Sequence, residues 1–273
     1  MGSGRSGSTI LGVVLGNLKN CFYGGELHLW AGDRGIPTDR DSAYEFWERV
    51  SQAFPDREKY FDLAASFNSQ LEYHTALASL FRSSNREIVQ QFHEQSVKFF
   101  KAIETVSERA VTIDSSHYAL RAHWLNKNPG LDVCYIYLYR DPVEVIVSHK
   151  RKDVEQKHMN FFKANVYLIW VSVFNNIIYS FLPKANKMKL RYEDFINRPA
   201  ETLTQIENKF RLESEELDLK NLDPGNLFRA NRIRLHQKIS LENKLKKTKV
   251  NPFEKALIYL LLWLLVFYVL LYF

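Results

Sequence analysis

The sequence is poor in cysteine and lacks any acceptor site for N-linked glycosylation. Cys21 and Cys134 are the only cysteines among 273 residues, and they are far apart, without CxxC spacing. No Asn is followed two positions later by Ser or Thr. Nothing therefore marks an oxidising secretory compartment, and we expect a reducing cytosolic environment for the folded domain.

A large charge excess and internal repeats are also lacking. Lys and Arg number 37 against 31 Asp and Glu, which gives a formal net charge of +6. This excess is too small to predict nucleic-acid binding, but a mildly basic surface suits an anionic ligand or an anionic membrane face. Hydrophobic residues make up 46% of the chain and aromatic residues 14%, which predicts one substantial core. We assign this domain to residues 1–250.

The C-terminus carries a long apolar run. Ala256 to Phe273 reads ALIYLLLWLLVFYVLLYF, and the preceding KLKKTKVNPFEK is basic. Under the positive-inside rule, residues 254–273 are expected to form a membrane helix, a tail anchor in the lipid bilayer with the catalytic domain on the cytoplasmic side. The alternative is a terminal helix docked on the domain or on a partner. A second charge-free stretch, Ala164 to Pro183, contains Asn and Ser side chains that would be costly in lipid, so it is predicted to be a buried core helix.

Helical and strand patterns alternate along the chain. Helices are predicted at 8–18, 41–54 (opened by Asp41 or Ser42) and 86–106, and short buried strands at 110–113, 133–139 and 188–190. This alternation predicts an α/β fold with an open parallel sheet flanked by helices. Ligands of such sheets bind at the carboxyl ends of the strands.

The opening residues MGSGRSGST form a glycine-rich loop that runs into the first helix. Glycines let the backbone approach a ligand closely, and the N–H groups and dipole of the helix N-terminus attract an anion. The loop is therefore P-loop-like. No Lys follows its last glycine, unlike the GxxxxGK[ST] pattern of nucleotide-triphosphate P-loops, and Arg5 stands in front of that glycine instead. A flexible leader is the alternative interpretation.

A second motif follows the strand at 133–139. It reads YRDPVEVIVSHK, in which Ser148 follows Arg140 by eight residues and Asp141 and Pro142 suit a helix start. Together, RSGST and R-D-P-x-x-x-x-x-S resemble the sulfotransferases that use 3′-phosphoadenosine 5′-phosphosulfate (PAPS). The resemblance implies that the loop binds the 5′-phosphosulfate and that Arg140 and Ser148 bind the 3′-phosphate. The donor-binding residues expected on this basis are Arg5, Ser6, Gly7, Ser8, Thr9, Arg140, Ser148, Tyr192 and Arg229.

The resemblance covers roughly residues 1–235. AVTIDSSHYALRAHWL resembles the acceptor-side strand and helix of bacterial and carbohydrate-type members. KMKLRYEDFINRPAETLTQI resembles the family's Tyr-Glu-Asp segment, which places Tyr192 near the nucleotide. GNLFRANR resembles the family's GNxxR element, which makes Arg229 a phosphate contact. The chain departs from the family at three places. Many relatives have Lys where this chain has His117, the usual Trp after the GNxxR element is lacking, and no strand precedes the loop. We therefore expect the first strand to be missing and the chain to be N-terminally truncated relative to the family.

Sulfuryl transfer needs in-line positioning, a base for the acceptor hydroxyl and positive charge on the leaving group. Glu26, in YGGELHLW, resembles the catalytic glutamate of tyrosylprotein and related bacterial sulfotransferases and is the expected general base. His28 is the second candidate base, and Arg5 is expected to stabilise the bridging oxygen. Asp114, Ser115 and Ser116 are further acceptor-side or loop contacts, with a helix N-cap as the alternative role of the two serines.

The sequence therefore predicts a PAPS-dependent sulfotransferase that acts on a hydroxyl group of a glycan, lipid or other acceptor and requires no metal. Two alternatives stay open. A catalytically impaired nucleotide-binding membrane protein would keep Arg140 and Ser148, whereas a P-loop kinase-like enzyme would need a Lys after the last glycine and a magnesium carboxylate.

Overall fold

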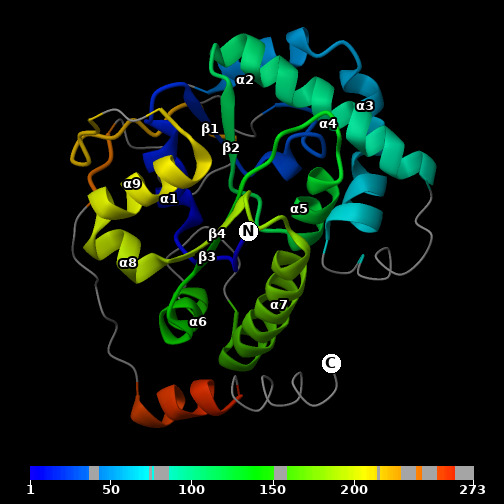
Figure 1. Cartoon of the computed structure of the whole chain (residues 1–273). Helices are drawn as coiled ribbons and strands as arrows, with labels where there is room; N and C mark the ends of the chain where they lie inside the picture. The colour runs from blue at the N-terminus through cyan, green and yellow to red at the C-terminus, as the bar shows by residue number, and fades with distance from the viewer. Residues whose placement is uncertain are drawn as a thin grey trace.

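The computed structural model describes residues 1–36, 43–73, 76, 86–150, 159–213, 216–228, 238–241 and 251–261. Its elements follow in the order α1 (Ser8–Gly16), β1 (Cys21–Gly25), η1 (Leu27–Leu29), α2 (Tyr44–Ala53), α3 (Arg57–Phe67), η2 (Asn68–Glu72), α4 (Arg86–Ser107), β2 (Val111–Asp114), α5 (Ala119–Asn126), β3 (Tyr135–Tyr139), α6 (Pro142–Lys150), α7 (Phe161–Phe181), β4 (Lys187–Arg191), α8 (Tyr192–Asn197) and α9 (Pro199–Phe210). Figure 1 shows the strands at the centre of the molecule with helices around them. The predicted α/β class is thus observed, and β1 and α3 are elements that the sequence pattern did not predict.

The strands form two separate parallel pairs. β1 pairs with β2, beginning at Cys21 and Val111, and β3 pairs with β4, beginning at Tyr135 and Lys187. The expected parallel pairing is confirmed, but the expectation of one continuous sheet is not, because a cavity separates β2 from β3. Among the described residues before α1, the extended pairing observed is a parallel bridge between Gly2 and Leu138.

Alternating side chains of β1 divide the interior into two apolar clusters. Cys21 and Tyr23 lie in a cluster with residues of α1, α8 and α9, whereas Phe22 lies in the opposite cluster, which is rich in aromatic residues of α2, α3 and α4. This period of two is expected of a strand covered on both faces. The β1–β2 pair therefore lies between two layers of helices.

Helix α7 is buried on one face only. Its inner face packs against α5 and α6, with Phe174 and Ile178 almost fully buried. Its outer face exposes a stripe of large apolar side chains: Phe162, Val166, Trp170, Ile177 and Phe181. The prediction of a buried core helix is therefore wrong for this face. In the part of the chain that the structure describes, α7 is the one helix long and apolar enough to cross a membrane.

The C-terminal helix is described only in part. Residues 252–261 are helical, whereas residues 262–273, most of the expected membrane helix, lie outside the described residues. Asp41 and Ser42, the expected start of the helix at 41–54, also lie outside them. Ile258 is buried in a cluster with residues of α6 and α7, and Lys150 makes a 3.0 Å ion pair with Glu254. The start of the C-terminal segment thus contacts the domain.

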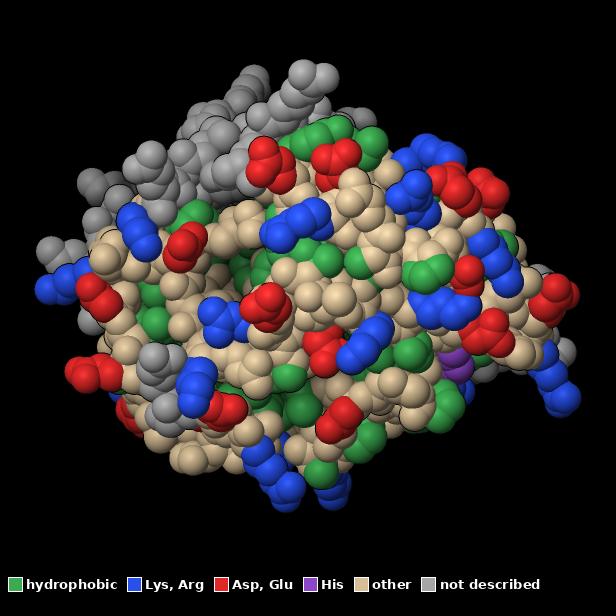
Figure 2. Space-filling view, turned by 90° about the horizontal axis from the view of Figure 1, so that it is seen from above, with side chains coloured by type: hydrophobic (Ala, Val, Ile, Leu, Met, Phe, Trp, Pro, Cys, Tyr) green, Lys and Arg blue, Asp and Glu red, His purple; other side chains and the backbone are tan. Residues whose placement is uncertain are grey.

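The surface charge is mixed on the face shown in Figure 2, where basic and acidic side chains alternate without a large field of one sign. Cys21 and Cys134 are both free thiols, the first buried and the second exposed.

Candidate active site

The glycine-rich loop folds into a tight turn in front of α1. Arg5 and Gly7 adopt positive φ values of 68° and 96°, and the first helical hydrogen bond runs from the Leu11 N–H to the Gly7 carbonyl. A Cβ at Gly7 would lie 2.3 Å from the Tyr192 ring, so this position needs glycine for space as well as for its φ. The N–H groups of the first helical turn therefore point out of the helix end beside a closely packed loop.

Arg140 lies against this loop. Its Nη1 donates a 3.4 Å hydrogen bond to the Arg5 carbonyl, and its guanidinium lies 4.6 Å from the centre of the Tyr192 ring. The Glu144 carboxylate is 3.7 Å away. Among the described residues, neither Arg140 Nε nor Ser6 Oγ has a hydrogen-bond partner, although both atoms are buried. The Arg140 guanidinium and the Ser6 hydroxyl thus lie at the loop with hydrogen-bond donors that no described residue uses, which fits a phosphate-bearing ligand.

Asp141 has the capping role proposed for it. Its carboxylate accepts a 2.8 Å hydrogen bond from the Val143 N–H, and α6 begins at Pro142. The Asp141 N–H donates to Glu193 at 2.9 Å. This ties the β3–α6 turn to the start of α8 and fixes where Arg140 leaves the strand.

The structure brings only part of the predicted donor site together. Ser148 is half-buried on α6, six residues and roughly 9 Å along the helix from its start at Pro142. Its neighbour His149 packs edge-on against Tyr167, whose hydroxyl accepts a 3.1 Å hydrogen bond from the Gly4 N–H. Arg229 lies outside the described residues, but Phe228, immediately before it, pairs with Gly25 at the end of β1.

Glu26 stands directly after β1 on a constrained backbone. Gly25 has a φ of 82°, and a Cβ there would lie 2.6 Å from the Phe228 carbonyl oxygen, to which the Glu26 N–H donates a 3.3 Å hydrogen bond. Burial, with a smaller contribution from the Asp114 carboxylate, raises the pKa of Glu26 to about 7. A carboxyl group tuned to this range is suited to accept a proton near neutral pH.

His28 is held differently. It is 4% exposed, and both its backbone N–H and its Nδ1 lie within 3.1 Å of Ser116 Oγ. Burial, followed by the nearby His117 and Arg121, lowers the pKa of His28 to about 3. A histidine with so low a pKa is a weak base, so the structure favours a packing role for it.

A buried ion network supports this region, and sequence reasoning did not find most of it. Arg121 on α5 pairs with Glu72, and its Nε donates a 3.0 Å hydrogen bond to Asp114 at the end of β2. Asp114 also accepts hydrogen bonds from the Ser116 N–H at 2.8 Å and, more weakly, from the Leu27 N–H at 3.4 Å. The network thus joins α5, η2 and β2 to the residue that follows Glu26.

The two serines do not have the capping role weighed for them. Tyr118 is the N-cap residue of α5, and the Ser115 N–H donates to the Gly25 carbonyl at 2.9 Å. Ser115 Oγ lies 2.8 Å from the Tyr23 hydroxyl. Asp114 and the two serines therefore connect β2 to β1 and η1 instead of starting a helix.

The aromatic rings of His117 and Tyr118 lie beside His28. Tyr118 and His117 stack with ring centres 4.7 Å apart, Tyr118 lies edge-on to His28 at 4.8 Å, and Tyr73 is 5.0 Å from Tyr118. Burial raises the pKa of Tyr118 to about 12, so its hydroxyl is neutral and able to donate a hydrogen bond. This aromatic side of the site contains His117, the position at which many of the resembled sulfotransferases have Lys.

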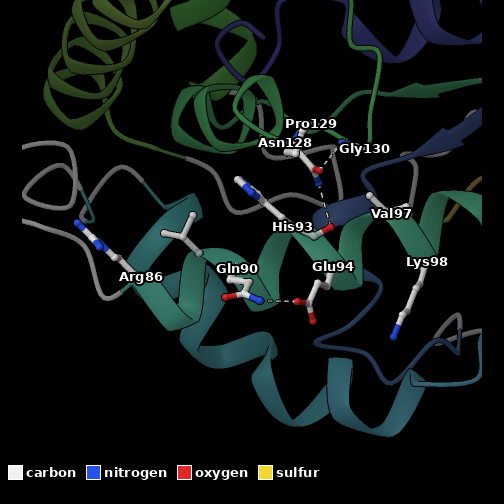
Figure 3. A pocket seen from close by; sticks show the side chains of 10 residues that line it. Arg86, Gln90, His93, Glu94, Val97, Lys98, Asn128, Pro129 and Gly130 are labelled. Carbon is white, nitrogen blue, oxygen red and sulfur yellow. Dashed lines mark hydrogen bonds between the residues drawn. The ribbon is translucent and has the colours of Figure 1, made fainter.

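A cavity of about 580 Å³ reaches the site from within the molecule and is lined by Ser6, Asp114 and Tyr118, among others. A second, more open hollow of about 630 Å³ lies between α4 and the turn after α5. Figure 3 shows the second hollow, in which Asn128 bonds the His93 carbonyl and Gln90 bonds Glu94. None of the predicted site residues lines it, whereas Ser6 and Ser8 of the glycine-rich loop and Asp114, Ser115 and Ser116 line the first cavity.

A family model described as the sulfotransferase family matches residues 1–216. The chain belongs to the sulfotransferase family. The resemblance seen in the motifs is thereby confirmed at the level of the family, and sulfuryl transfer is the general activity that this membership supports. No curated protein matches the chain.

Two solved structures are similar to this sulfotransferase. The sulfotransferase domain from the curacin biosynthetic pathway has a TM-score of 0.54 and 19% sequence identity, with 94% of this chain and 93% of that chain covered. The sulfotransferase domain from the olefin synthase of Synechococcus PCC 7002 has a TM-score of 0.49 and 20% identity, with coverages of 94% and 90%. At this identity, the first of these likenesses shows the fold.

Proposed function

We propose that this sulfotransferase transfers a sulfuryl group from PAPS to a hydroxyl acceptor by in-line displacement. The observation that carries the proposal is that the glycine-rich loop, Arg140 and Tyr192 contact one another. Arg140 Nη1 lies 3.4 Å from the Arg5 carbonyl oxygen, and the Tyr192 ring packs against both Arg140 and Gly7. Arg gives planar, two-pronged recognition of phosphate oxygens, and a helix N-terminus favours an anion. The donor supplies the activated sulfuryl group.

The proposed donor-binding roles are those that the family resemblance implies. Ser6, Gly7, Ser8 and Thr9 would hold the 5′ end of the donor at the start of α1, and Arg5 would stabilise the leaving oxygen. Arg140, with Ser148 and Arg229 as further contacts, would hold the 3′-phosphate. The Tyr192 ring, which packs against both Gly7 and Arg140, would keep these two halves of the site in register.

Replacing Arg140 tests donor binding. We expect Arg140→Ala to weaken the binding of 3′-phosphoadenosine 5′-phosphate at least tenfold, because a charge-assisted contact to the 3′-phosphate is lost, and to leave ADP binding nearly unchanged. Isothermal titration calorimetry without metal measures both ligands. Arg198→Ala is the matched control, since Arg198 is exposed and pairs with Asp194 and Glu201 at the start of α9. Equal loss of both nucleotides, or no loss of either, would contradict the assignment of Arg140.

Glu26 is the proposed general base. Its raised pKa leaves it partly protonated at neutral pH but strongly basic once ionised, whereas the lowered pKa of His28 makes that residue a poor proton acceptor. In the proposed step, the Glu26 carboxylate takes the acceptor hydroxyl proton while the acceptor oxygen bonds to sulfur and the bridging S–O bond breaks. The nucleotide leaves with the bonding electron pair, next to Arg5.

We also propose that residues 254–273 attach the sulfotransferase to a lipid bilayer, with the catalytic domain on the cytoplasmic side. The support is compositional: the run from Ala256 to Phe273 is uncharged, and the flank that precedes it is basic. The described start of the helix exposes Phe253, Tyr259 and Leu260. These side chains suit the boundary between headgroups and acyl chains.

Charged substitutions in the apolar run test this attachment. We expect the full chain to stay with membranes after alkaline carbonate extraction and the variant Leu264→Arg/Leu265→Arg to be released, since each central Arg costs about 2.5–3.5 kcal/mol in a spanning helix. Centrifugation followed by immunoblotting measures the distribution. Lys246→Arg/Lys247→Arg, which keeps the charge of the flank, is the control. Release of the unaltered chain would show peripheral attachment only.

A further inference from the structure

Large apolar side chains form a continuous stripe along the outer face of α7. Successive helical residues are about 100° apart, so these positions fall within about 100° of one another around the axis and extend over about 28 Å of its length. Two half-buried residues, Ile169 and Val173, lie in the same sector and fill the stripe between them. The exposed members of this α7 stripe are Phe162, Val166, Trp170, Ile177 and Phe181.

The opposite face of α7 is part of the domain. It packs against α5 and α6, and Asn165 and Asn175 on this face are 1% and 0% exposed. The Tyr167 hydroxyl accepts a 3.1 Å hydrogen bond from the Gly4 N–H of the glycine-rich loop. Although α7 is long and apolar enough to cross a membrane, only the α7 stripe is available to lipid, so the folded domain can meet a bilayer only with the axis of α7 along the surface.

The charges around α7 are of one sign. Residues 159–192 contain no Asp or Glu, and their cations are Lys163, Lys184, Lys187, Lys189 and Arg191. The Lys189 ammonium donates a 2.8 Å hydrogen bond to Asn176 Oδ1, and the Lys187 ammonium donates one of 2.6 Å to the Tyr179 carbonyl. Both ammonium groups thus lie beside the last two turns of the helix. Cations at the edge of an apolar helix face suit the anionic headgroups of a membrane.

The described start of the C-terminal segment joins α7 at its first turns. Ile258 is 1% exposed and packs in one apolar cluster with Ala164 and Leu168 of α7. Figure 1 shows this segment, in red, beside the lower end of α7. Attachment of residues 254–273 to lipid, as proposed above, would therefore bring a bilayer to this end of the α7 stripe.

We propose that the α7 stripe docks the catalytic domain on an anionic lipid bilayer, with α7 lying at the boundary between headgroups and acyl chains. The apolar face of such a helix inserts to a depth of about 5–10 Å. Phe and Trp side chains supply the buried apolar area, and the lysines beside the stripe add attraction to acidic headgroups. This docking is a property of the folded domain and adds to any attachment through the C-terminal run.

Docking would place the active site close to the bilayer. Tyr167, which contacts the glycine-rich loop, and Val166, which belongs to the α7 stripe, are consecutive residues of one helix. The loop would therefore be separated from the lipid by about one helix diameter, which is about 10 Å. A docked enzyme would act where lipid headgroups and other membrane-bound hydroxyl groups are concentrated. This consequence rests on the proposed sulfuryl transfer, whereas the docking does not.

Flotation with lipid vesicles tests the docking. The protein used is the full chain carrying Leu264→Arg/Leu265→Arg, called the tail variant, in which the C-terminal run is not expected to enter a bilayer. Any binding through α7 is then measured by itself. The tail variant is purified in detergent and diluted into vesicles made of equal parts of phosphatidylcholine and phosphatidylserine.

We expect the tail variant to float with these vesicles. Adding Phe162→Gln/Phe181→Gln should weaken the binding at least tenfold, because two large apolar side chains no longer enter the lipid. Ile36→Gln, which alters an exposed apolar residue outside α7, is the matched control and should leave the binding unchanged. Far-UV circular dichroism of each variant checks that the fold is retained.

The charge of the docking face is tested in the same assay. Lys184→Glu/Lys189→Glu should weaken binding to the acidic vesicles at least tenfold, because acidic headgroups then meet carboxylates. Lys184→Arg/Lys189→Arg keeps the charge and should bind like the tail variant. Vesicles of phosphatidylcholine alone should bind the tail variant more weakly than the acidic mixture does.

Photolabelling locates the contact. A phospholipid with a diazirine in its acyl chain should label peptides that contain Phe162 or Trp170, as mapped by mass spectrometry, both in the tail variant and in the unaltered chain. No flotation of the tail variant, equal flotation after Phe162→Gln/Phe181→Gln, or labels confined to residues 253–273 would each overturn the proposal. So would a stable dimer in analytical ultracentrifugation that ignores vesicles and becomes monomeric on Phe162→Gln/Phe181→Gln, which would assign the stripe to contact between two copies of the chain. Since no readout uses nucleotide and the tail variant removes the C-terminal contribution, failure here is distinct from failure of the proposed sulfuryl transfer or of attachment through residues 254–273.

Discussion

Glu26→Gln should reduce the rate of sulfuryl transfer by about 10²- to 10⁴-fold, because the amide cannot accept the proton of the acceptor hydroxyl. Release of 3′-phosphoadenosine 5′-phosphate from PAPS, with the hydroxyl acceptor that gives the highest rate, measures the effect. With a pKa of about 7, Glu26 is ionised above neutral pH, so the parent rate should rise with pH through about 7. This acidic limb should be absent from the residual rate of the variant.

The same substitution should increase stability at high pH. The pKa of Glu26 is raised from 4.5 to about 7, so the folded state binds its proton more tightly than the unfolded state does. Its contribution is therefore fully present below pH 4.5 and is lost as pH rises through about 7, a cost of about 3 kcal/mol at pH 8. Glutamine does not ionise, so urea unfolding at pH 8 should show the variant to be more stable than the parent. Loss of activity together with loss of stability would instead indicate a damaged fold.

His28→Asn provides the comparison for the base assignment. Asn can keep a polar contact with Ser116, and His28 carries no proton-transfer role in the proposed reaction. Its effect on the rate should therefore remain under about tenfold. An acidic limb that disappears in His28→Asn and persists in Glu26→Gln would assign the base to His28.

Arg121→Met should lower the free energy of unfolding by about 3–5 kcal/mol. The substitution leaves the buried carboxylates of Glu72 and Asp114 without their cation, and an uncompensated buried charge is costly. Although burial opposes the charge of Arg121, Glu72 and Asp114 together raise its pKa, and Arg121 also holds the pKa of Asp114 below its usual value despite burial of that carboxyl. Urea unfolding followed by circular dichroism measures the change.

Two controls distinguish the loss of a buried ion pair from the loss of an exposed one. Lys101→Met removes a partner of Glu104 in an exposed 3.0 Å pair and should change stability by no more than about 1 kcal/mol. The double variant Arg121→Met/Glu72→Leu should recover part of the loss, because it removes one of the stranded charges. An effect of Arg121→Met as small as that of Lys101→Met would contradict the structural role given to this network.

The sequence predicted the elements whose conformation is indicated by a few adjacent residues. The glycine loop, the start of α6 at Pro142 and the parallel strands at 111–114 and 135–139 could each be read from a few adjacent residues. The strand at 21–25 could not, because CFYGG ends in two glycines and has no alternation of polar and apolar residues. Its strand conformation depends on pairing with β2 and with Phe228, both distant in the sequence.

The site was predicted where a motif exists and missed where only tertiary structure creates it. Arg140 and Tyr192 belong to recognisable segments, and the structure brings them to the loop. Glu72 lies in a polar stretch, and no spacing relates it to Arg121 on α5. That pairing follows from the packing of η2 against α5. A buried polar residue whose partner lies on another element leaves no pattern in a single sequence.

The apolar stripe on the outer face of α7 has a consequence for handling the purified protein. Phe162, Val166, Trp170, Ile177 and Phe181 are all at least 37% exposed along one side of a helix. Exposed apolar surface of this kind promotes self-association in water. A variant that lacks only the apolar run at residues 256–273 should therefore still aggregate in water. Polar substitutions on this face, such as Phe162→Gln and Phe181→Gln, would also be needed for a soluble sample.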